Sequence, residues 1–202
     1  KGTGKTAFLV HLATDQLFQG RHVIHVSYAG KTDHIVEGYE EIFEEIAERY
    51  HLDGLREAHD QAVRNRVIMN FNQAAVTVTQ VTRSVGAMIR DGHFNADVVI
   101  VDGFDFRRGD PAEIDEFRGF AREMGLEIWF SATLPQDEEV PPGLLPLLRP
   151  YSPVVDIVVV LRPQESHLRL QLVKDHDRDV TDDLSLALDS KILLILENPA
   201  SR

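Results

Sequence analysis

Apolar and polar positions along the chain predict helices that are separated by short buried strands. Between residues 5 and 17 the apolar residues recur at the spacing of an amphipathic helix, and Gly20 follows where a C-terminal cap is expected. The run 22–30, HVIHVSYAG, is short and rich in β-branched residues, which is typical of a buried strand that leaves into a loop. A helix followed by a strand indicates an α/β fold.

The same alternation continues through the middle of the chain. Residues 35–50 place apolar side chains on one helical face and glutamates around the rest, which predicts a helix with a solvated acidic surface. Residues 78–89 predict another helix, and the continuous apolar run 98–101 predicts a strand that is buried on both faces of a parallel sheet. The segment 53–73 stays open, because a polar helical stretch gives way to VIMNF, which fits either a short strand or a helix.

The next helix carries its own start and stop signals. Asp110 is an N-cap, Pro111 stands at the first helical position, and Glu113 completes a capping box, while Gly125 ends the helix. Residues 126–133, LEIWFSAT, predict the strand that follows. This segment therefore repeats the helix and strand order of the N-terminal part.

The C-terminal third has a different pattern. A proline-rich segment predicts mostly loop, with one helical turn near 144–148. Residues 154–161 and 167–175 are separated by a short polar turn and predict an antiparallel hairpin. The acidic stretch 175–183 is interpreted as solvated loop, and 191–196 is a possible final strand.

Composition narrows the classes of function. At 202 residues the chain predicts a single domain spanning 1–202, and it contains no apolar stretch near the ~18 residues of a membrane helix, so no membrane partner is expected. The absence of cysteine removes disulfides and thiolate metal sites and favours a cytoplasmic location. A net charge of −12 repels a phosphate backbone, which makes nucleic acid an unlikely partner.

The first residues, KGTGKT, match the end of the phosphate-binding pattern GxxxxGK[ST]. In such a loop the glycine lets the backbone bend around phosphate, the lysine reaches the outer phosphates, and the hydroxyl binds Mg²⁺. The predicted helix starts directly after the motif, so its dipole would face the phosphates; the competing interpretation is a glycine-rich surface turn. The candidate nucleotide contacts are Gly2, Thr3, Gly4, Lys5, Thr6 and Ala7.

A second acidic group is needed to hold Mg²⁺, and the carboxyl end of a buried strand is where ligands bind in open α/β sheets. Asp102 directly follows the apolar run 98–101, as the Walker B pattern requires. We therefore expect Thr6 and Asp102 to be the metal-binding pair. A merely structural aspartate is the alternative.

With these two motifs in place, the chain resembles the P-loop NTPases of the RecA-like group, which includes KaiC-type and replicative-helicase ATPases. The resemblance implies a mostly parallel α/β sheet flanked by helices, with a C-terminal antiparallel hairpin and a first strand upstream of residue 1. It also implies ATP and Mg²⁺ as cofactors, bound at the carboxyl edge of the sheet.

The sequence departs from this group where a water-polarising glutamate is expected. After the strand at 22–28 the chain reads Ser27-Tyr28-Ala29-Gly30, and the position after Asp102 is Gly103. Both seats lack the glutamate, so rapid hydrolysis is not expected. Asp105 or Asp33 could substitute, although loop and capping roles also explain them.

Two further sets of residues follow from the resemblance. Ser131 or Thr133, at the end of FSAT, could place a hydroxyl near the γ-phosphate, and Thr133 joins Lys5 and Asp102 as the candidate catalytic residues. The group uses a Lys-x-Arg pair on the last hairpin to reach a neighbouring subunit, and here Lys174 and Arg178 are the candidates for that interface.

The favoured function is a Mg·ATP-binding, RecA-like ATPase whose hydrolysis is slow or stimulated by a partner, acting as a homo-oligomer or with a protein partner. The alternative is a regulatory or scaffold module that binds ATP to control assembly without hydrolysing it. A small-molecule kinase is disfavoured because no basic lid follows the phosphate loop.

Overall fold

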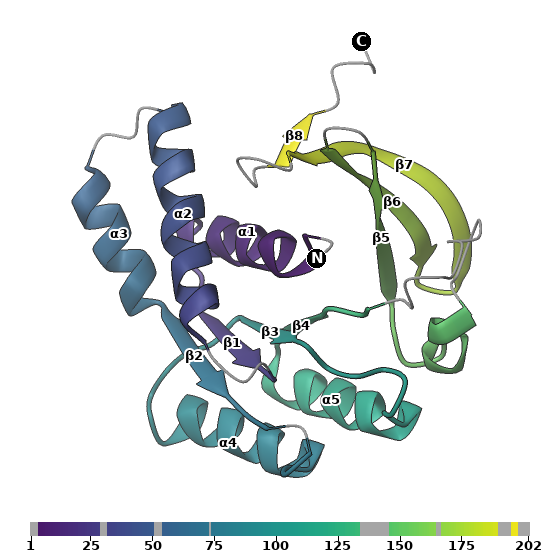
Figure 1. Cartoon of the computed structure of the whole chain (residues 1–202). Coiled ribbons are helices and arrows are strands. Elements are labelled where there is room, and N and C mark those ends of the chain that lie inside the picture. The colour runs from purple at the N-terminus through teal and green to yellow at the C-terminus, as the bar shows by residue number, and fades with distance from the viewer. Residues whose placement is uncertain are drawn as a thin grey trace.

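The buried apolar runs of the N-terminal two thirds form a parallel sheet, and the C-terminal third forms a separate antiparallel sheet (Figure 1). The computed structural model describes residues 4–28, 32–50, 54–72, 74–133, 146–164, 167–189 and 195–197. This architecture confirms the predicted fold class, a mostly parallel α/β sheet flanked by helices and followed by antiparallel strands.

The parallel sheet has the strand order β2-β1-β3-β4. Its strands are β1 (Val23–Ser27), β2 (Arg66–Asn70), β3 (Val98–Asp102) and β4 (Glu127–Phe130). Every residue of the two central strands, β1 and β3, is buried, as their continuous apolar runs predict. The register places Ser27 beside Asp102, so both strands end at the same edge of the sheet.

Five helices cover the two faces of this sheet (Figure 1). The first group is α1 (Lys5–Phe18), α2 (Asp33–Tyr50) and α3 (Leu55–Arg64), and the second is α4 (Val78–Arg90) and α5 (Pro111–Met124). Each group contributes to its own hydrophobic cluster, one on either side of the strands. The capping box predicted for α5 is confirmed: Asp110 Oδ1 accepts from the amide of Ala112, and its own amide donates to Glu113 Oε2.

Alternation along β3 assigns each side chain to one face. Val98 and Ile100 pack in the cluster of α1 and α2, whereas Val99 and Val101 pack in the cluster of α4 and α5. Each fully buried aliphatic side chain contributes roughly 1.5–3 kcal/mol, so this register is strongly specified. The alternation puts the Asp102 side chain on the α1 face, at the carboxyl edge of the sheet.

The two sheets are joined through the 3₁₀ helix η1 (Pro146–Tyr151). Tyr151 is buried among the aromatic residues behind β4, and its hydroxyl lies 2.8 Å from the carbonyl oxygen of Phe106 and 2.7 Å from that of Gly109. The antiparallel sheet then follows, and it forms a curved wall to one side of the parallel sheet (Figure 1). Its strands are β5 (Ile157–Pro163), β6 (His167–Asp175), β7 (Arg178–Asp189) and β8 (Ile195–Glu197).

The structure settles the expectations for the less regular segments. Of the open segment 53–73, α3 takes the polar part and β2 takes VIMN. The hairpin is confirmed as β5 and β6, but the expectation that 175–183 is loop is wrong from Arg178 onward, because β7 pairs there with β6. Residues 144–145 of the predicted helical turn lie outside the described residues. In the described part of the chain, no helix is long and apolar enough to cross a membrane.

Candidate nucleotide-binding site

The site begins where the glycine-rich segment turns into α1. Gly4 is the N-cap and has a φ of 74°, a left-handed conformation that glycine adopts without strain. Its carbonyl accepts the amide of Phe8 at 2.8 Å, so the helix starts at Lys5, with Thr6 and Ala7 in its first turn. The first amides of a helix have no partner within it, and together with the helix dipole they favour an anion.

The two sequence motifs meet at this point. The Thr6 hydroxyl donates to Asp102 Oδ2 at 2.8 Å, although the two residues are 96 positions apart in the sequence. Asp102 is the last residue of β3 and is buried. The helix start and the strand end therefore form one site.

A second hydroxyl holds the other oxygen of the same carboxylate. Ser131, directly after β4, donates to Asp102 Oδ1 at 2.6 Å, and it accepts the amide of Gly103 at 3.0 Å. Ser131 is as buried as Asp102. Each oxygen of the Asp102 carboxylate thus has its own hydroxyl donor.

Lys5 lies close enough to Asp102 to interact with it electrostatically. Burial lowers the pKa of the Lys5 ammonium from its ordinary value, and the negative charge of Asp102 opposes that shift. A phosphate in the site would act in the same direction as Asp102, because a nearby negative charge favours the charged lysine.

Beneath the site lies a polar layer that the sequence patterns did not reveal. His25, in β1, is fully buried, and its Nδ1 lies 3.0 Å from the hydroxyl of Tyr39 in α2, while its Nε2 has no partner within the described residues. Burial lowers the pKa of His25 to about 4, so the imidazole is neutral at pH 7; Asp102 partly opposes the shift, and the charges of Arg66 and His34 add to it.

Tyr39 links this layer to the outer surface of the molecule. Its phenol pKa lies above its usual range because the residue is buried, and the Arg66 guanidinium stacks 4.2 Å from its ring centroid. Arg66 Nη2 in turn lies 3.5 Å from Glu40 Oε1. The one signal in the sequence was a histidine inside an apolar strand.

The structure gives ordinary roles to the two aspartates considered as substitutes for the missing glutamate. Asp105 accepts the amide of Arg107 at 3.0 Å and pairs at 3.6 Å with the side chains of both Arg107 and Arg108, which makes it a loop-organising residue. Asp33 is the exposed first residue of α2. Gly103, in the second glutamate seat, has a φ of 85°, which disfavours a larger residue there.

Other predicted site residues lie apart from this cluster or outside the described residues. Thr133 is exposed, two residues beyond the buried Ser131, and its catalytic role stays a prediction. Gly2 and Thr3, as well as Ala29 and Gly30 after β1, lie outside the described residues.

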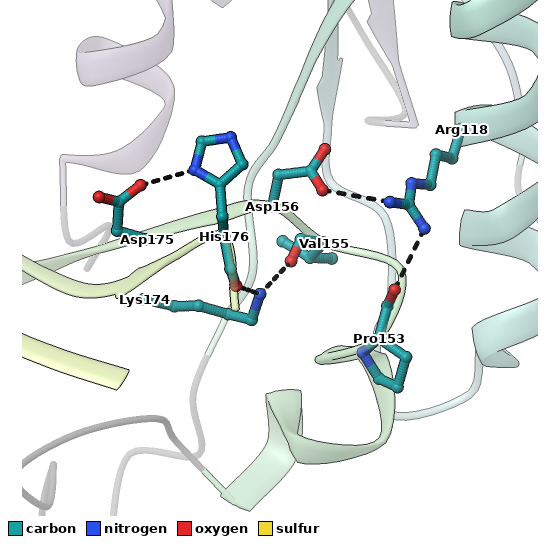
Figure 2. Close-up of polar contacts among 7 residues, drawn as sticks. All are labelled: Arg118, Pro153, Val155, Asp156, Lys174, Asp175 and His176. Carbon is teal, nitrogen blue, oxygen red and sulfur yellow. Dashed lines mark hydrogen bonds and ion pairs between the residues drawn. The ribbon is translucent and has the colours of Figure 1, made fainter. Parts of the chain in front are cut away.

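The interface candidates on the hairpin have different surroundings (Figure 2). Lys174 is buried, and its ammonium donates to the carbonyl oxygens of Val155, at 2.7 Å, and of His176, both in its own chain. Arg178, at the start of β7, is exposed. The structure therefore places Lys174 in a contact within the chain, whereas the Arg178 side chain faces solvent.

A network beside Lys174 ties the hairpin to the parallel half of the molecule (Figure 2). Arg118 of α5 donates to the carbonyl oxygen of Pro153 at 3.1 Å and pairs with Asp156 Oδ1 at 3.3 Å. The amide of His176 donates to the Asp156 carbonyl at 2.6 Å, so the tip of β6 and β7 is fastened to the segment that precedes β5.

A parallel sheet with Gly-Lys-Thr at the start of its first helix and a buried aspartate at the end of a central strand has the fold of the RecA-like P-loop NTPases. Among solved structures, the chain is similar to the ATPase domain of a RecA-like helicase of the DnaB type, with a TM-score of 0.66 and 16% sequence identity over 98% of this chain and 81% of that chain. No family model matches the chain, and no curated protein matches it either.

Proposed function

We propose that this chain, as a single domain, binds Mg·ATP at the carboxyl edge of its parallel sheet and hydrolyses it slowly or when a partner stimulates it. The supporting observation is the contact between Thr6 Oγ1 and Asp102 Oδ2 at 2.8 Å, which joins two independently recognisable motifs. The fold it shares with an ATPase domain supports the same assignment.

In this proposal each residue of the site has one task. The amides from Gly4 to Ala7, together with Gly2 and Thr3 outside the described residues, hold the phosphates, and Lys5 adds a positive charge beside the outer ones. The half-buried position of Lys5 strengthens its attraction to phosphate, because partial exclusion of water reduces screening.

The donor atoms suit Mg²⁺, which prefers oxygen ligands and is usually held by one or two protein groups together with phosphates and water. The Thr6 hydroxyl and the Asp102 carboxylate supply such oxygens side by side. A bound Mg²⁺ would neutralise charge on the phosphates. Thr6 and Asp102 would orient that charge, with Asp102 held in place from both sides.

The alternative function, an ATP-dependent regulatory or scaffold module that does not hydrolyse ATP, also has a specific observation in its favour. Gly103 occupies one glutamate seat in a left-handed conformation, and Asp105 is engaged by Arg107 and Arg108. We propose that the partner in either case is a second copy of the chain or another protein in the cytoplasm, with the exposed Arg178 available at the interface.

Titration with fluorescently labelled ATP and GTP, with and without Mg²⁺, tests the proposal. We expect Mg²⁺-dependent binding that Lys5→Ala weakens by roughly tenfold to a hundredfold, the size of a lost hydrogen bond to a charged group. Arg83→Ala, an exposed cation on α4, is the matched control and should bind like the wild type. Equal binding by Lys5→Ala and wild type would refute the proposed site.

Phosphate release separates the two functions. An ATPase loses turnover with Lys5→Ala, whereas a switch has no turnover to lose and loses only its nucleotide-dependent assembly. Measurement of assembly by light scattering in the same samples decides between them.

A further inference from the structure

We infer that Ser131 is a positioning residue for the metal-binding carboxylate, an inference that rests on the proposed function and extends it. Its hydroxyl fixes Asp102 Oδ1, so that Oδ2 stays on the side of Thr6, where the divalent cation would bind. The task of Ser131 is therefore to orient Asp102, and it does not contact the nucleotide.

The hydrogen-bond inventory of Ser131 supports this role. A serine hydroxyl has one proton to donate, and here it goes to Asp102 Oδ1 at 2.6 Å, the short distance typical of a charge-assisted hydrogen bond. The same oxygen accepts the amide of Gly103 at 3.0 Å. A residue that senses the γ-phosphate must donate to it, and the Ser131 proton is already committed.

The backbone around Ser131 fixes the hydroxyl in place. β3 and β4 pair in register up to Val101 and Phe130, and the amide of Ser131 continues the ladder by donating to the Val101 carbonyl at 3.2 Å. Ser131 is therefore the neighbour of Asp102 across the sheet. The left-handed turn at Gly103 keeps its amide within reach of the Ser131 hydroxyl.

Burial makes the orientation consequential. Ser131 and Asp102 each have a relative exposure of 7%. Little water is available there to replace a lost donor, so without the hydroxyl the carboxylate would lose the partner of one oxygen and be free to rotate. Residues that orient a metal ligand in this way typically change metal affinity by roughly tenfold to a hundredfold when they are removed.

Two variants of one shape test the inference. Ser131→Thr keeps the hydroxyl, and Ser131→Val has the same branched shape without it. Binding of labelled ATP is titrated with Mg²⁺ at fixed nucleotide, and again in EDTA to give the affinity without metal. We expect Ser131→Val to raise the Mg²⁺ concentration for half-maximal binding about tenfold with unchanged affinity in EDTA, and Ser131→Thr to behave like the wild type.

Three results would overturn the inference: a wild-type Mg²⁺ midpoint in Ser131→Val, equal impairment of both variants, or a matching loss of affinity in EDTA, which would indicate a direct nucleotide contact. Thermal unfolding of the apoprotein checks that both variants fold, and Ser131→Ala, which also lacks the hydroxyl, replaces the valine variant if that one does not. Failure of the wild type to bind ATP with Mg²⁺ refutes the proposed function itself, a result distinct from any difference among the variants.

Discussion

The carboxyl edge of the parallel sheet and the tip of the β6–β7 hairpin were both picked out by motif, yet they place their charged residues in opposite ways. At the sheet edge, Thr6 and Asp102 converge from distant parts of the chain. At the hairpin, Lys174 turns inward to carbonyl groups of its own chain, and Arg178 faces solvent. A motif thus predicted a shared site in the first region, and in the second region only a set of residue types.

The difference comes from the regularity of the strands. In β1, β3 and β4 the pairing is in continuous register, so alternation carries a side chain reliably to one face. The antiparallel sheet has register shifts between Val158 and Val159 and again along β6, and each shift redirects the side chains that follow. Spacing in the sequence therefore translates into position only in the first region.

The largest expected effect concerns His25, beneath the site. The unfolded chain has the ordinary pKa of 6.5 at this histidine, and the folded protein has about 4, so on acidification the unfolded state takes up the proton first. Stability is fully present above pH 6.5 and falls as the pH drops toward 4, by about 3 kcal/mol over that window.

Urea unfolding at pH 7.5 and pH 4.5 measures this loss in the wild type and in His25→Leu. We expect the variant to show a smaller loss; some remains because burial also lowers the pKa of His11, in the same direction. An identical pH dependence in both proteins would show that His25 is not buried in its neutral form.

The next effect distinguishes the two lysines. Lys174→Met leaves two carbonyl groups without their donor and should lower the free energy of unfolding by about 1–3 kcal/mol, with ATP affinity unchanged. Lys5→Met should do the reverse, with a large loss of ATP affinity. A Lys174→Met protein of wild-type stability that loses only oligomer-dependent hydrolysis would instead support an interface role for Lys174.

A backbone pair extends the comparison. Gly103 (φ 85°) at the sheet edge and His176 (φ 54°) at the hairpin tip both adopt left-handed conformations. Gly103→Ala should destabilise the protein by about 1–2 kcal/mol, whereas His176→Gly should stabilise it by up to about 1 kcal/mol, since glycine adopts this conformation without strain. Thermal unfolding measures both, and opposite signs are the expected outcome; equal signs would contradict the assigned conformations.

Much of the parallel half could be predicted from the sequence, because buried strands and capped helices have strong local signals. The apolar run of β3 and the capping box at Asp110 are examples. The short, half-buried β2 could not be distinguished from a helix, and the acidic start of β7 was interpreted as loop, because an antiparallel strand with one solvated face can carry many charges.

The site was predictable only as far as its motifs. Choosing between Ser131 and Thr133 required the pairing of β3 with β4, which places Ser131 beside Asp102 and which no local pattern encodes. The role of His25 depends on Tyr39, which lies on another element. Both cases show that polar contacts between elements are fixed by register and packing.

The smallest expected effect is at the bridge between the two halves. Arg118 and Asp156 form a partly exposed ion pair, with side-chain exposures of 26% and 57%. Asp156→Asn should change the free energy of unfolding by less than about 1 kcal/mol, as is usual for such pairs. A larger loss in urea unfolding would mean that the network in Figure 2 holds the two sheets together more strongly than its exposure indicates.

A double-mutant cycle on Thr6→Val and Asp102→Asn, measured as ATP affinity at saturating Mg²⁺, tests most directly whether the two motifs form one nucleotide site. Residues in contact within one network couple by about 0.5–3 kcal/mol, and we expect a coupling energy in that range. Losses that simply add, within about 0.5 kcal/mol, would contradict the account.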